Sequence, residues 1–238
     1  MERVLRGVVA IDGPSGTGKS TVARQLANRL SAAYLDTGAM YRAVTLAALW
    51  TDVDVHDEYA VVALLPKLDL TIGTDPHSAA VLLDGEDVSA EIRGADVTLA
   101  VSPVSAVAAV RQHLVALQRD LIYAAVGGVG GIVVEGRDIG TVVAPDAGLK
   151  IYLTAADRAR AQRRTEQDSA AGRAVTVDAT LADVRRRDTY DSSRTASPLR
   201  AAADAVEVDT TDLDITGVLA RLETLVELRG MVAPAVRV

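Results

Sequence analysis

Short apolar runs alternate along the chain with segments whose apolar residues recur at helical spacing. The runs are rich in Val, Ile, Leu and Ala, as buried strands are, and cover residues 8–11, 33–36, 132–134, 149–153 and 205–208. The helical pattern covers residues 22–30, 37–49, 105–125, 157–170 and 178–191. Because strands that alternate with helices form parallel sheets, we expect an α/β fold with a doubly wound, mostly parallel core.

The pattern changes between residues 67 and 125. Short segments broken by Gly, Asp and Pro lie at 68–73, 80–83 and 87–88. A tight-turn signal at 83–86 predicts that they form a small antiparallel insertion, which the helix at 105–125 follows. We expect residues 127–131 to form a flexible loop and residues 229–238 to form a frayed tail.

The first apolar run leads directly into the glycine-rich segment GPSGTGKST, which fits the pattern G-x-x-x-x-G-K-[ST]. Glycines allow successive backbone N–H groups to point at phosphate oxygens, and the dipole of the following helix favours the same anion. Lys19 then supplies a cation for the β and γ phosphates, and the Ser20 hydroxyl can ligate Mg²⁺. The candidate ATP-binding residues are Gly13, Pro14, Ser15, Gly16, Thr17, Gly18, Lys19, Ser20 and Thr21.

Composition narrows the range of partners. The chain has 238 residues, of which 49% are hydrophobic and 24% charged, which is typical of a globular protein, here taken as one domain over 1–238. A net charge of −7 argues against a nucleic-acid binder, whereas the arginines, clustered near 158–164 and 185–194, suit a small, highly charged anion. The chain has no cysteine for a thiolate metal site. We find no leader or apolar run of about 18 residues and expect a cytoplasmic protein without a membrane partner.

Two charged motifs follow predicted strands, where ligands gather in such sheets. In DTGAMYR, Arg42 lies in the first turns of a helix that Thr37 can cap. The Arg42 side chain faces either solvent or an anion near the cap, where the helix dipole favours negative charge. In EGRDIGT, Arg137 and Asp138 either pair with each other or face the cleft, with Arg137 as a phosphate donor and Asp138 as an acceptor for a base or sugar. The neighbouring glycines allow close approach of the backbone and favour the second reading.

Two arginine-rich helices offer further candidates. Arg187, Asp191 and Arg194 share one face if their helix continues that far, whereas Arg185 and Arg186 point elsewhere. Both this set and the run Arg158, Arg160, Arg163 and Arg164 are consistent with solvated surface charges. In a phosphoryl-transfer enzyme, mobile arginines of this kind close over the transferred group.

These segments resemble the bacterial cytidylate kinases, a branch of the nucleoside monophosphate kinases. IDGPSGTGKST, LDTGAMYRA, DGEDVSAEIR, SPVSAVAAVR, GRDIGTVVAPDA and RRRDTYDSSR occur in the order and spacing of that family, over nearly the whole chain. DTGAMYR and GRDIGTVV are more specific than the phosphate loop. Two departures are small: Thr37 stands where many relatives have serine, and Pro103 follows Ser102.

The resemblance implies a P-loop kinase core with an inserted subdomain for the monophosphate (about 67–125) and a short helical lid (about 157–175). It implies phosphorylation of CMP and dCMP by ATP with Mg²⁺, by a protein we expect to be a monomer. Arg158, Arg163 and Arg164 are the lid candidates for the transferring phosphoryl. On the acceptor side, Ser102, Asp138 and Arg111 would contact cytosine; the full implied set is Thr37, Tyr41, Arg42, Ser102, Arg111, Arg137, Asp138, Arg187, Asp191 and Arg194.

Two alternatives stay open. One is a kinase of another small acceptor, such as shikimate or a different nucleotide. The other is a nucleotide-regulated binding protein, although a GTPase would need an Asn-Lys-x-Asp segment, and the lysines stand only at 19, 67 and 150.

Overall fold

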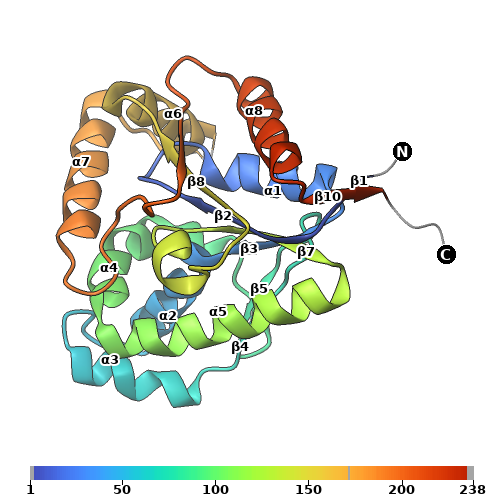
Figure 1. Cartoon of the computed structure of the whole chain (residues 1–238). Helices are drawn as coiled ribbons and strands as arrows, with labels where there is room; N and C mark the ends of the chain where they lie inside the picture. The colour runs from blue at the N-terminus through green and yellow to red at the C-terminus, as the bar shows by residue number, and fades with distance from the viewer. Residues whose placement is uncertain (1–2, 171, 235–238) are drawn as a thin grey trace.

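The fold centres on a five-stranded, wholly parallel sheet (Figure 1), in a computed structural model that describes residues 3–170 and 172–234. The strand order is β3-β7-β2-β8-β9, so β2 occupies the middle. The strands are β2 (Gly7–Asp12), β3 (Ala33–Asp36), β7 (Gly131–Glu135), β8 (Leu149–Thr154) and β9 (Val206–Asp209). All five correspond to predicted runs, and the doubly wound α/β prediction is confirmed.

Helices cover both faces of this sheet, as Figure 1 shows. On one face, α1 (Lys19–Arg29) and α8 (Ile215–Leu228) pack through Leu26 and Leu222 in a core with β2 and β8. On the other, α2 (Thr37–Trp50) and α5 (Ala108–Gly128) share a second core that includes Met40 and Leu114. Beside the sheet, α6 (Asp157–Ala170) packs against α7 (Val177–Ser193).

The predicted antiparallel segments form a separate three-stranded sheet of β4 (Leu70–Ile72), β5 (Val81–Leu83) and β6 (Glu86–Asp87). The predicted turn joins β5 to β6, and Asp84 and Gly85 there have φ values of 51° and 84°, as a type I′ turn requires. Along the chain, α3 (Glu58–Leu64) precedes these strands and α4 (Ala95–Ala106) follows them, and neither helix was predicted from the sequence. Short 3₁₀ turns at Leu65–Lys67 and Glu91–Arg93 complete it.

Three sequence predictions need correction. The helix expected from residue 105 starts at Ala108, because α4 and α5 meet at Val107 in a bend of 96°. The loop expected at 127–131 is mostly regular, since α5 extends to Gly128 and β7 begins at Gly131. The expected tail holds the strand β10 (Val232–Pro234), which pairs with β1 (Arg3–Leu5), and residues 235–238 lie outside the described part. The predicted lid range includes residue 171, which is not described either.

Candidate active site

The glycine-rich segment forms a tight loop between β2 and α1. Gly13 has φ of 146°, and a Cβ there would lie 2.2 Å from the Leu153 carbonyl oxygen. Gly16 has φ of 81°, and a Cβ would lie 2.9 Å from the Arg160 carbonyl oxygen. Only glycine fits both positions, so packing against β8 and α6 fixes the path of the loop. The buried Lys19 ammonium donates to the Pro14 carbonyl oxygen at 2.7 Å, and burial lowers its pKa.

Glu135, to which the sequence analysis gave no role, lies directly beneath this loop. Ser20 donates to one of its oxygens at 2.9 Å, and the Tyr34 hydroxyl donates to the other at 2.5 Å. Burial and the neighbouring Asp36 raise the pKa of Glu135. The sequence did hold a signal, because a carboxylate that ends an apolar strand reaches the ligand edge of a parallel sheet.

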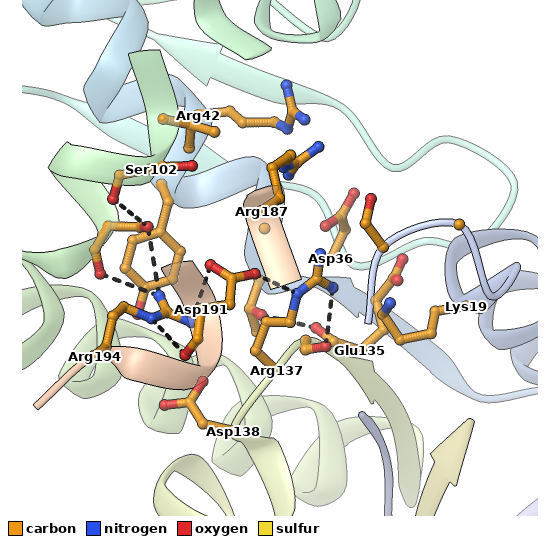
Figure 2. A pocket seen from close by; sticks show the side chains of 18 of the residues that line it. Lys19, Asp36, Arg42, Ser102, Glu135, Arg137, Asp138, Arg187, Asp191 and Arg194 are labelled. Atoms are coloured by element: carbon orange, nitrogen blue, oxygen red, sulfur yellow. Dashed lines mark hydrogen bonds and ion pairs between the residues drawn. The ribbon is translucent and has the colours of Figure 1, made fainter. Parts of the chain in front are cut away.

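A single cavity extends from the phosphate loop to α4 and α7 (Figure 2). Asp191 lies between Arg137 and Arg194, and Lys19 approaches from the loop side. All ten residues of the implied acceptor set line this cavity, together with Ser15, Gly16 and Lys19 of the loop. Residues far apart in the sequence therefore face one volume, because three strand ends and the helices α2, α4, α5 and α7 meet there.

Arg137 and Asp138 do not pair with each other. Arg137 donates to Asp191 at 3.0 Å and to the Gly13 carbonyl oxygen at 3.1 Å. Although burial raises the pKa of Asp191, Arg137 and Arg194 hold it below its ordinary value. Arg137 thus connects the phosphate loop to helix α7.

Asp138 forms a buried ion pair with Arg111 at 2.5 Å. Arg111 also donates to the Ser105 carbonyl oxygen at 3.0 Å, and its guanidinium carbon lies 5.1 Å from the centre of the Tyr41 ring. Ser102 lies on α4 one turn before Ser105 and accepts, through its carbonyl oxygen, a hydrogen bond from the Ser105 hydroxyl. Fixed donors and acceptors of this kind can read the edge of a planar base.

Asp12 holds the turn that carries Arg137 and Asp138. Its carboxylate accepts backbone hydrogen bonds from Ile139 and Gly140, both at 2.8 Å, at the start of the single π-helical turn (Ile139–Val143). Burial raises the pKa of Asp12 to about 6, against the lowering effect of these hydrogen bonds. Asp12 had the same signal as Glu135, since it also ends an apolar strand, but no role was predicted for it from the sequence.

Positive charge is concentrated on one side of the cavity. Arg42, Arg164 and Arg187 all line it, and Thr37 lies nearby, where its hydroxyl donates to the Glu135 carbonyl oxygen at 2.7 Å. Burial, Arg187 and Arg164 lower the pKa of Arg42 to about 9. An anion placed among these guanidinium groups would relieve their mutual repulsion.

The arginines of α6 have different surroundings. Arg164 lines the cavity, whereas Arg158 is exposed and outside it. Arg163 donates to the backbone oxygens of Thr210, Thr211 and Leu213. Arg160, for which we expected no individual role, is buried and donates to the Ser15 carbonyl oxygen at 2.9 Å. As expected, Arg185 and Arg186 point elsewhere, to Asp157 and Asp183.

A second groove lies on the other side of the phosphate loop. Its walls are the loop and the start of α1, the helix α6 and the segment before α8, and its lining includes Gly18, Thr21, Arg163, Gln167, Leu213 and Ile215. No sequence motif predicts this groove, because its walls come from three separate segments of the chain.

In the described part of the chain, no group of three or more His, Cys, Asp or Glu side chains is placed to hold a metal ion. Within the same residues, no single helix has the length and apolar composition to cross a bilayer, although the bent pair α4 and α5 meets those two criteria jointly.

Comparison with known proteins adds independent information. The family model described as cytidylate kinase matches residues 9–228. The chain is 59% identical over 219 residues to the cytidylate kinase of Nocardia farcinica, covering 92% of this chain and 93% of the relative. It is 60% identical over 222 residues to the cytidylate kinase of Rhodococcus jostii, covering 93% and 95%.

A crystal structure of an uncharacterized protein from Eubacterium ventriosum is similar in fold alone, with a TM-score of 0.50 and 10% identity, covering 94% of this chain and 99% of that one. The family match and the two sequence relatives each extend over most of the chain. The protein therefore belongs to the cytidylate kinase family.

Proposed function

We propose that this protein transfers the γ-phosphoryl group of ATP to CMP and dCMP, giving CDP and dCDP. The observation that carries the proposal is the single cavity in which a phosphate loop faces both an arginine cluster and the buried Arg111–Asp138 pair. A donor phosphate, an acceptor phosphate and a base would then have complementary groups in one enclosed volume.

On the donor side, residues Gly13 to Thr21 would hold the phosphates of ATP, and Lys19 would contact the β and γ groups. The groove beside Gly18 and Thr21, with Leu213 and Ile215 as apolar walls, would take the adenosine. The ammonium of Lys19 lies in the cavity that also holds the acceptor residues, as in-line transfer requires.

Mg²⁺ fits the oxygen groups beside the loop. The Ser20 hydroxyl and the Glu135 carboxylate lie 2.9 Å apart, and Mg²⁺ prefers such hard oxygen ligands, completed by water and substrate phosphates. The raised pKa of Glu135 marks a buried carboxylate that a nearby cation would stabilise. When bound, the ion would neutralise charge on the phosphates that Lys19 also contacts.

On the acceptor side, Arg42, Arg137 and Arg187 would bind the phosphate of CMP, with Thr37 beside them. Asp138, Arg111, Ser102 and Tyr41 would surround cytosine, whose N4 amine needs an acceptor. Uracil would leave a buried polar group mismatched, which costs free energy. Asp191 and Arg194 would hold the sugar and its surroundings.

The reaction needs no covalent intermediate and no obligatory base. A phosphate oxygen of CMP attacks the γ-phosphorus in line with the leaving ADP oxygen, because a phosphate dianion is already nucleophilic. Arg164, with Arg158 and Arg163 on the same helix, would neutralise charge on the transferring group as this lid segment closes. We further infer that residues 67–125 act as an inserted CMP-binding subdomain and that the protein works as a cytoplasmic monomer.

A coupled assay of ADP formation tests the function. CMP and dCMP should be phosphorylated at least tenfold more efficiently, in kcat/KM, than UMP, AMP or shikimate. The assignment fails if CMP and dCMP are poor acceptors. ATP binding without formation of CDP would support a regulatory binding protein instead.

A further inference from the structure

Two charged residues from different helices hold both sides of Ser15 in the phosphate loop. The Ser15 N–H donates to one oxygen of Asp188 on α7 at 3.3 Å, and the Ser15 carbonyl oxygen accepts from Arg160 on α6 at 2.9 Å. Arg160 and Asp188 pair with each other at 2.5 Å. The three groups form a closed ring, so the orientation of the Ser15 backbone depends on the relative position of α6 and α7.

Burial makes this ring a strong constraint. The Arg160 residue is only 4% exposed, and its remaining terminal nitrogen is held by Asp157 at 2.6 Å. Its backbone also lies directly over Gly16, where even one added carbon would clash. A buried guanidinium with three acceptors is costly to displace, because each lost partner leaves a desolvated charge.

Helix α7 also carries acceptor-site residues. Arg187 precedes Asp188 directly, and Asp191 lies one turn further on, where it accepts from Arg137. A phosphate bound by Arg187 and Arg137 would therefore act on the helix that holds the Ser15 N–H. Figure 2 shows Arg187 and Asp191 on the acceptor side of the cavity, opposite Lys19.

From this geometry we propose that Arg160 and Asp188 are positioning residues that couple CMP binding to the donor loop through α7. The proposal rests on the proposed function, since it takes CMP as the acceptor. Neither residue touches the reacting atoms. CMP draws α7 into one position, Asp188 and Arg160 then fix the Ser15 backbone, and the loop binds ATP more tightly.

The test measures the affinity for a non-hydrolysable ATP analogue, AMP-PNP with Mg²⁺, by calorimetry with and without saturating CMP. In the unmodified protein, CMP should lower the Kd for AMP-PNP at least fivefold, and AMP-PNP should lower the Kd for CMP by the same factor. In Asp188→Asn, which keeps the shape but removes the charge, the coupling should fall below twofold. Asp183→Asn breaks the exposed pair with Arg186 on the same helix and should retain the coupling.

Exchange of the Ser15 amide proton, followed by NMR without ligand, tests the ring independently of CMP. Exchange should be at least tenfold faster in Asp188→Asn than in Asp183→Asn. Arg160→Lys keeps the charge but cannot reach the same three acceptors. It should show the same loss of coupling and the same faster Ser15 exchange, and it replaces Asp188→Asn if that variant does not fold.

The outcomes separate the two proposals. If CMP is phosphorylated but Asp188→Asn keeps full coupling, or if the unmodified protein shows none, the inference about α7 is overturned and the proposed function stands. If CMP is not a substrate and Ser15 exchange still accelerates, the proposed function fails and the ring around Ser15 stands. If the Ser15 amide exchanges at the unmodified rate in both Asp188→Asn and Arg160→Lys, the ring does not hold the Ser15 backbone.

Discussion

The Arg111 guanidinium and the Asp138 carboxylate form an ion pair at 2.5 Å, with side chains only 5% and 6% exposed. The two residues come from α5 and from the turn after β7, and both line the cavity. A buried pair of this kind is retained at a desolvation cost. Its place beside Tyr41 and Ser105 fits selection of a base, and leads to the first prediction.

Replacing Asp138 with Ala should weaken CMP selection more than ATP binding. The variant loses an acceptor on the base side, while the phosphate loop keeps its contacts. We expect KM for CMP to rise at least tenfold and the preference for CMP over UMP to fall, with KM for ATP within twofold. Steady-state kinetics with both acceptors and a thermal unfolding curve measure these effects; equal losses for CMP and ATP would contradict the role.

Replacing Lys19 with Ala should depress kcat at least 100-fold while preserving the fold. The ammonium lies at the phosphate loop. Its loss removes a positive charge that would stabilise the negative charge on the phosphates during transfer. Lys67→Ala, at an exposed position, is the matched control and should keep full activity. Near-normal turnover in Lys19→Ala would contradict the proposed contact of Lys19 with the β and γ phosphates.

The arginines of α6 should differ in their effect on turnover. Arg164→Ala should lower kcat at least tenfold, because its guanidinium lines the cavity beside Arg42 and Arg187. Arg158→Ala should lower kcat less, because Arg158 reaches the transferring group only if the lid closes. Rates at saturating ATP and CMP show which of the two substitutions lowers kcat more. A larger loss for Arg158→Ala would contradict this order and indicate extensive closure of the lid.

Stability should depend on pH through Asp12. Its pKa is about 6 in the folded protein and 3.8 as a free side chain. Between these two values Asp12 holds a proton in the folded state that it has lost in the unfolded state. The contribution of Asp12 to the free energy of unfolding therefore falls as pH rises. A difference of about two pKa units corresponds to a total fall of about 3 kcal/mol, of which about 2 kcal/mol occurs between pH 4 and 7.

Asp12→Asn cannot titrate and supplies the comparison for that effect. The free energy of unfolding of the unmodified protein minus that of the variant should decrease over pH 4 to 7. Urea unfolding at several pH values measures the difference. A constant difference would mean that Asp12 has an ordinary pKa in the folded state.

The sequence predicted the core and the residues around the cavity better than their pairing. Apolar periodicity and the glycine loop act over a few residues, so β2, β7 and the path into α1 followed directly. Pairing depends on the fold as a whole: Arg137 and Asp138 are adjacent, yet β7 directs them to different helices, to Asp191 and Arg111. Asp188 and Arg160 gain their contacts with Ser15 only because the fold places α6 and α7 beside the loop.

Three helices were not predicted from the sequence, namely α3, α4 and α8. The apolar residues of α8 recur at helical spacing after Asp214, which caps it, so the signal was present. By contrast, α4 contains Pro103, a residue that disfavours a helix interior, and so its helical signal is weaker. The break at Val107 has no strong sequence marker, since Val107 is apolar like its neighbours Ala106 and Ala108.

That break at Val107 makes chain length as important as residue identity. Because α4 and α5 meet at 96°, Ser105 at the end of one helix and Arg111 near the start of the next meet across the corner, at 3.0 Å. One residue inserted between them would rotate the rest of α5 by about 100° about its axis. Arg111 would then turn away from Asp138, so this segment should accept substitutions while excluding insertions and deletions.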